Sequence, residues 1–270
     1  MQETALKKHG CEPHPDVALQ LYSVRSLLRD RFKETLQALA GIGFGTVEFA
    51  HDFGAMEPEV LADFLQGIGL RAGGLFSSAG AIADPRSATY RYARALGCEF
   101  VSLGVPLTPD NVREQAAHLL TLRRTAADQG LTLTYHNHAY EFQQLPDGRT
   151  LLEALCDETA AEGLQFELDV FFAHATGHEP CALLERFRGR VPQIHFNDLE
   201  RGLALPIQDG KACMQRSTEL GTGCLDLPAI RQAAEATGVR LIVLEQHTLR
   251  ANPLDSVRTN WDYLRNLGAV

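Results

Sequence analysis

The feature that most constrains the fold is an eightfold repetition of a strand-like run, a polar turn and an amphipathic helical segment. Glycines end most of the helical segments before the next strand begins. Each connection is long enough for a right-handed crossover, and eight parallel units of this kind close a barrel. We predict strands at residues 17–22, 46–49, 70–76, 99–103, 131 into 134–142, 164–169, 191–196 and 240–245, and helices at 32–40, 60–68, 85–96, 109–129, 151–161, 180–187, 227–237 and 254–267.

The length of 270 residues agrees with one closed barrel, because a (β/α)8 TIM barrel uses about 250 residues as a single unit. A doubly wound open sheet is the alternative. Its nucleotide-binding form needs a Gly-x-Gly-x-x-Gly turn after the first strand, and this sequence has none there. We therefore predict an α/β fold with a tail at 1–16 and one catalytic barrel at 17–270, interrupted by a glycine-rich excursion at 197–225.

Composition argues against several classes of partner. The formal net charge is −9, whereas binding to nucleic acid depends largely on Lys and Arg that neutralise phosphates. No apolar run approaches the roughly 20 residues of a membrane span, and the first 16 residues lack the apolar stretch of a signal peptide. The six cysteines form no Cys-x-x-Cys pair, so we expect reduced, packed thiols in a cytoplasmic protein.

Metal-ligand and acid-base side chains stand where the predicted strands end. In a closed barrel the reactive groups belong at the carboxyl ends of the strands, so side chains at these positions should converge. Carboxylates at the ends of apolar strands would be costly to bury without a metal ion or another partner. The residues that this rule selects are Glu48, His136, His138, Glu141, Asp169, His195, Glu245, Gln246 and His247.

These segments resemble the sugar phosphate isomerase/epimerase superfamily of xylose-isomerase-like TIM barrels. The resemblance runs from about residue 17 to 267 and rests on 19–25, 43–48, 135–138 with 141–142, 168–169, 189–191 with His195, and 244–246. It implies one divalent ion held by Glu141, Asp169, His195 and Glu245, with His136 as the alternative ligand from strand five. A mixed carboxylate and imidazole site suits several metals, and we expect Mn²⁺ before Mg²⁺, Co²⁺ or Zn²⁺.

Two segments depart from the pattern of this superfamily. Many relatives read His-x-Lys-Asp after strand seven, whereas this chain has Asn197 in place of the lysine. The stretch 220–223 reads Leu-Gly-Thr-Gly where relatives often show Gly-Glu-Gly, and His247 stands where Asp is common. We expect the substrate pocket to differ accordingly.

The resemblance implies an isomerase or epimerase that transfers a proton next to a carbonyl of a sugar or keto-polyol through an enediolate. Proton transfer would fall to Glu141, Glu245 and His138. A dehydratase or lyase acting on an inosose or a 3-keto-glycoside is the alternative, followed by a noncatalytic sugar-binding protein and an AP-endonuclease-like hydrolase. The partner would be a small molecule, with a homo-oligomer left open, and the expected substrate-binding residues are Glu48, His136, Gln20, Tyr22, Asn197 and His247.

Overall fold

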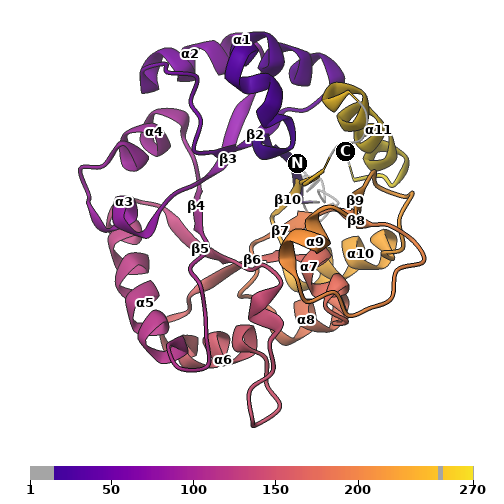
Figure 1. Cartoon of the computed structure of the whole chain (residues 1–270). Helices are drawn as coiled ribbons and strands as arrows, with labels where there is room; N and C mark the ends of the chain where they lie inside the picture. The colour runs from indigo at the N-terminus through magenta and orange to yellow at the C-terminus, as the bar shows by residue number, and fades with distance from the viewer. Residues whose placement is uncertain (1–14, 249–251, 270) are drawn as a thin grey trace, which may run out of the picture.

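The computed structural model describes residues 15–248 and 252–269. A closed barrel of parallel strands stands at its centre, in the order β1-β10-β7-β6-β5-β4-β3-β2, with helices around the outside (Figure 1). The predicted (β/α)8 fold is therefore confirmed. The barrel strands are β1 (Asp16–Gln20), β2 (Thr46–Ala50), β3 (Arg71–Phe76), β4 (Phe100–Leu103), β5 (Thr132–His136), β6 (Gln165–Asp169), β7 (Gln193–Phe196) and β10 (Leu241–Leu244). The expected tail, 1–16, lies outside the described residues except for Pro15 and Asp16.

The helices include the eight expected ones and three short additions. The additions α3, α7 and α9 begin at side-chain caps from Ser78, Asp169 and Asp209, respectively. None of the described helices is both long and apolar enough to cross a membrane. The bounds are α1 (Arg25–Ile42), α2 (Pro58–Gly67), α3 (Ala79–Ala83), α4 (Ala88–Leu96), α5 (Val112–Asp128), α6 (Leu151–Glu158), α7 (Val170–Ala175), α8 (Pro180–Arg186), α9 (Gly210–Met214), α10 (Leu227–Thr237) and α11 (Pro253–Asn266).

The apolar core has two parts. The larger part fills the layer between the strands and the surrounding helices. There, each fully buried Leu or Phe contributes about 1.5–3 kcal/mol relative to exposure. The smaller part lies inside the barrel and consists of Ala18, Phe100, Leu241 and Val243. In β1 and β10 the next side chains on this inner face, two positions after Ala18 and Val243, are the polar Gln20 and Glu245.

The excursion after β7 is anchored by one carboxylate. Its strands β8 (Asp198–Leu199) and β9 (Ser217–Thr218) pair antiparallel. The Asp198 carboxylate accepts the backbone N–H groups of Leu199, Gly221, Gly223 and Leu225 at 2.9–3.1 Å. A Cβ on Gly223 would lie 2.2 Å from Asp198 Oδ1, so this glycine permits the close approach. The 221–225 turn is therefore held against β8, which begins two residues after the end of β7.

Candidate active site

The carboxyl ends of the barrel strands surround a cavity of about 350 Å³. Met214 of the excursion helix α9 contributes to its wall, so the excursion reaches the mouth of the barrel. Most of the side chains that the sequence singled out meet here. The cavity is lined by Gln20, Tyr22, Ala50, His51, Phe76, His136, His138, His195, Met214, Glu245 and His247.

Asp169 ends β6 and begins α7, and its two oxygens have different surroundings. Oδ1 accepts the N–H groups of Phe171 at 2.8 Å and Phe172 at 3.3 Å, which caps the short helix. Oδ2 is buried and has no hydrogen-bond partner. The Asn137 side chain holds the neighbouring backbone, because its Oδ1 accepts the Asp169 N–H at 3.0 Å. A buried carboxylate oxygen without a partner is costly, and a cation would satisfy it.

Asp169, Glu245 and His247 form one buried group that could hold a metal ion. His195 adjoins it, with Nδ1 2.9 Å from Glu245 Oε2. His247 Nδ1 lies 3.6 Å from Glu245 Oε2, and His247 Nε2 lies 3.7 Å from Asp169 Oδ2. Atoms about 2.1 Å from one metal ion lie about 3.0 Å apart at a right angle and about 3.4 Å apart at the tetrahedral angle. The His195–Glu245 separation is close to these values, and one ligand atom from each of Asp169, Glu245 and His247 lies within 4.8 Å of the others. With one His247 nitrogen as a ligand, the donor set fits a divalent ion.

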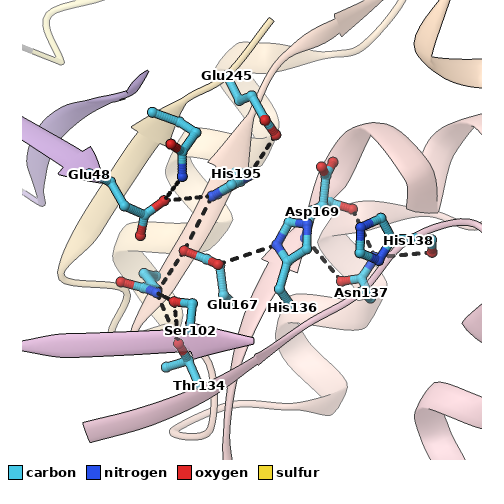
Figure 2. Close-up of polar contacts among 12 residues, drawn as sticks. Glu48, Ser102, Thr134, His136, Asn137, His138, Glu167, Asp169, His195 and Glu245 are labelled. Atoms are coloured by element: carbon cyan, nitrogen blue, oxygen red, sulfur yellow. Dashed lines mark hydrogen bonds and ion pairs between the residues drawn. The ribbon is translucent and has the colours of Figure 1, made fainter. Parts of the chain in front are cut away.

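The other nitrogen of His195 faces a polar network inside the barrel, as Figure 2 shows. Nε2 lies 3.0 Å from Glu48 Oε2 and 3.3 Å from Glu167 Oε1. Gln20 donates to Glu48 at 2.5 Å, and Gln193 donates to Glu167 at 2.6 Å. A carboxylate that accepts from one imidazole nitrogen orients the ring and leaves the other nitrogen free for a metal ion. Glu48, expected to bind substrate, thus lies beneath His195.

The burial of these groups changes their protonation. Burial, reinforced by the nearby Glu167, raises the pKa of Glu48 to about 8. Burial alone would lower the pKa of His195, but Glu167 and Glu245 outweigh it and raise that pKa above its ordinary value. Burial would likewise raise the pKa of Glu245, yet His247 and His195 lower it below its ordinary value. The Glu245 carboxylate and the His195 imidazolium therefore stabilise each other as an ion pair, and a metal ion bound by both would replace the proton on His195 Nδ1.

Glu141 lies apart from these groups. Its Oε1 accepts the Tyr135 hydroxyl at 2.7 Å, and its Oε2 accepts the His138 backbone N–H at 2.8 Å. Neither of the two possible metal-binding groups among the described residues includes it. The resemblance placed the Glu141 carboxylate on the metal ion. In the structure, 3-10 helix η2 (Tyr140–Phe142) turns this carboxylate back toward β5, where it accepts the Tyr135 hydroxyl and the His138 N–H instead.

His136, the alternative ligand from strand five, faces the inside of the barrel. Its Nδ1 is 3.2 Å from Glu167 Oε2, but the two atoms are not aligned as a hydrogen bond. With Glu167 and His195 it forms a second buried group of metal-ligand type. Burial, together with the neighbouring His195, lowers the pKa of His136 to about 4, so the ring is neutral at physiological pH.

Sequence reasoning missed the layer of polar side chains below the cavity. Glu167, Gln193 and Thr134 each stand two positions before a singled-out residue, namely Asp169, His195 and His136. Since side chains alternate along a strand, these pairs face the same side. This alternation of side chains along each strand is the sequence signal that could have indicated these residues. Ser102 completes the layer, with its hydroxyl 2.8 Å from Thr134 Oγ1.

Residues at the rim of the cavity are held by neighbouring backbone. Tyr22 is 37% exposed, and the Arg25 guanidinium lies 3.8 Å from the centroid of its ring. Arg25 also donates to the carbonyls of Tyr22 and His247. Asn197 lies with Nδ2 3.4 Å from His247 Nε2, while its own Oδ1 is buried without a partner. Of the expected substrate-binding residues, Gln20, Tyr22, His136 and His247 line the cavity.

The sequence of this chain matches a family model described as xylose isomerase-like TIM barrel over residues 36–267. The chain belongs to this family. A sugar phosphate isomerase/epimerase from Parabacteroides distasonis has a similar structure, with a TM-score of 0.77 and 18% identity over 97% of this chain and 98% of that one. A structure of IOLI protein with a binding zinc atom gives a TM-score of 0.74 and 13% identity over 93% and 97% of the two chains. At these identities the likeness shows the fold.

Among curated proteins, the chain is 24% identical to an inosose dehydratase from Clostridium beijerinckii over 153 residues. The match covers 53% of this chain and 50% of the relative, so it spans about half the length of the relative. Isomerases, epimerases and dehydratases therefore stand among the relatives of this xylose isomerase-like barrel.

Proposed function

We propose that this xylose isomerase-like barrel is a divalent-metal-dependent isomerase or epimerase that acts on a sugar or keto-polyol through an enediolate. The observation that carries the proposal is the unpartnered Asp169 Oδ2 at the carboxyl end of β6, buried beside Glu245 and His247, which follow β10 on the far side of β7. The net charge of −9 speaks against the AP-endonuclease-like alternative. The five described cysteines are all free, which supports a cytoplasmic location.

The proposed metal ligands are Asp169, His195, Glu245 and His247. His247 takes the place that the resemblance gave to Glu141, because Glu141 Oε1 and Oε2 already accept hydrogen bonds. A bound divalent ion, Mn²⁺ in our proposal, would polarise the substrate oxygens and stabilise the developing charge of an enediolate. Glu48 and Glu167 hold the His195 ring from below through Nε2, so that Nδ1 faces the cavity.

Proton transfer falls to groups that line the cavity. Glu245 is ionised and can accept a proton from the substrate carbon. His138 lines the same cavity from the connection after β5, and burial, together with the nearby His136, lowers its pKa to about 3. Its ring is therefore neutral and could exchange a second proton with the substrate. Phe172, with its ring centroid 5.5 Å from that of His138, helps to exclude water.

A dehydratase or lyase acting on an inosose or 3-keto-glycoside is the second candidate, favoured by the curated relative named inosose dehydratase. It would use the same first step, in which the carbon next to the carbonyl loses a proton. The two activities differ in whether that proton returns or a β-hydroxyl or β-glycoside leaves.

Two measurements test the proposal. Purified protein should carry about one divalent ion per chain, and the Asp169→Asn, His195→Ala double variant should lose it in elemental analysis. Keto-sugars, inososes and 3-keto-glycosides should then be screened in deuterium oxide by NMR. Exchange of a carbon-bound proton without loss of water or aglycone supports the isomerase, and elimination supports the lyase. Unchanged metal content in the double variant would remove the proposed site.

A further inference from the structure

A second cavity, of about 480 Å³, opens on the same face of the barrel as the metal-ligand cluster. Three segments form it, and each follows a barrel strand on the catalytic side: the connection after β5, the residues after α7, and the excursion after β7. We call it the carboxamide pocket, after the three glutamines in its lining. Its polar lining consists of Tyr140, Gln143, Gln144, Thr176, His178 and Gln208.

The carboxamide pocket and the active-site cavity share a wall. The rings of His138 and Tyr140 are stacked, with centroids 5.6 Å apart and planes at 12°. His138 lines the active-site cavity, whereas Tyr140 lines the carboxamide pocket. Tyr140 is 37% exposed, so its ring forms an open rim between the two. The outer wall is pinned by a backbone bond of 2.7 Å from Ile207 N–H to the Ala175 carbonyl.

The chemistry of the lining defines the kind of ligand. No Lys, Arg, Asp or Glu is among the described residues that line the carboxamide pocket. Burial lowers the pKa of His178, which packs on Phe142 and lies 3.3 Å from Thr176 Oγ1, so its ring is neutral too. Carboxamides both donate and accept hydrogen bonds, and an aromatic ring offers an apolar face. Such a lining suits a neutral ring that bears hydroxyl groups.

The active-site cavity also lacks a Lys or Arg side chain for a phosphate group. None of its described lining residues is Lys or Arg. Arg25 at the rim is engaged by the carbonyls of Tyr22 and His247. Phosphate recognition relies on such charged donors, whereas the carboxamide pocket supplies amides and a neutral imidazole, and His195 of the active-site cavity faces the Glu245 carboxylate at 2.9 Å. Both volumes lie in the range of about 300–1,000 Å³ that is usual for ligand pockets.

We propose that the carboxamide pocket binds the second, uncharged sugar ring of a glycoside whose reacting ring lies in the active-site cavity. This inference rests on the proposed function and narrows its substrate class to unphosphorylated glycosides. The glycosidic oxygen would lie beside Tyr140, at the rim between the two cavities. The glutamines after β5 and in the excursion would form hydrogen bonds with the hydroxyl groups of the second ring.

Binding is tested by saturation-transfer NMR on magnesium-loaded protein, with sucrose, trehalose, cellobiose and lactose as probes and glucose 6-phosphate as the charged comparison. At least one neutral disaccharide should receive saturation on both rings. The Gln144→Leu, Gln208→Leu double variant should weaken its binding by about tenfold or more, because each neutral hydrogen bond is worth up to about tenfold. Gln232→Leu, the same change at an exposed position on α10, is the matched control and should bind as the parent does.

Separate readouts distinguish failure of this inference from failure of the proposed function. If free keto-sugars exchange their protons while no disaccharide binds, or the double variant binds disaccharides as the parent does, the second-ring assignment is wrong and the isomerase stands. If glucose 6-phosphate binds more tightly than every neutral disaccharide, the uncharged class is wrong. If metal and proton exchange are absent but disaccharide binding responds to the two glutamines, the pocket stands and the catalytic proposal falls.

Discussion

Replacing Asp198 by Asn should loosen the 221–225 turn from β8. Each carboxylate oxygen accepts two backbone N–H groups: Oδ1 those of Leu199 and Leu225, and Oδ2 those of Gly221 and Gly223. In either orientation the Asn amide would present an NH2 group to two N–H donors at 2.9–3.1 Å. Each buried donor left unpaired costs about 1–3 kcal/mol, so we expect a loss of about 2–4 kcal/mol after partial relaxation.

Amide hydrogen exchange measures this loss directly. A loss of about 2–4 kcal/mol corresponds to a fall of about 30- to 1,000-fold in the protection of the Gly223 and Leu225 amides. Asp226→Asn is the matched control, because Asp226 caps α10 through one bond to Ala229 N–H and Asn caps helices as well as Asp does. Unchanged protection at Gly223 in Asp198→Asn would refute the reasoning, because the four hydrogen bonds to Asp198 would then not stabilise the turn.

Three further predictions concern the carboxylates and His247. Glu245→Gln, compared with the parent at equal metal occupancy, should slow solvent deuterium incorporation by at least about 10²-fold, because the amide is no base; an unchanged rate would favour His138. Burial raises the pKa of Glu141 to about 7 from 4.5. Between pH 4.5 and about 7, the folded protein therefore keeps a proton on Glu141 that the unfolded chain has lost. Over this range the free energy of unfolding falls as pH rises, by at most about 3 kcal/mol. Urea unfolding should show that Glu141→Gln removes this component, and a parent-variant difference that is independent of pH would contradict it. His247→Ala should weaken divalent metal binding by at least about tenfold in chelator competition, whereas unchanged affinity would favour His136 as the ligand.

The sequence predicted the barrel because the alternation of strands and helices is long-range and redundant. Each barrel strand contains several β-branched or apolar residues, so an error at one end did not change the count of eight. The short helices α3, α7 and α9 span five or six residues, which is less than two turns. Periodicity cannot be read over that length. Their capping residues were visible, but such residues are equally common in turns.

The candidate site was predictable where a side chain ends a strand, and less so where a loop decides its direction. Asp169, His195 and Glu245 come together because parallel strands end on one face. Glu141 lies five positions beyond His136, and only the turn at 140–142 determines that its carboxylate points back to Tyr135. Spacing alone carries no information on that turn. The position of Glu48 beneath His195 likewise depends on side-chain packing, which the sequence does not show.

The two roles of Asp169 have a consequence for ion selectivity. Oδ1 is committed to the first amides of α7, so the carboxylate can offer a cation only one oxygen. Calcium is commonly bound by six to eight oxygens, often with a bidentate carboxylate, whereas smaller ions accept fewer ligands at shorter distances. Calcium should therefore compete poorly for the metal site, because the capping of the six-residue helix α7 occupies one of the two Asp169 oxygens.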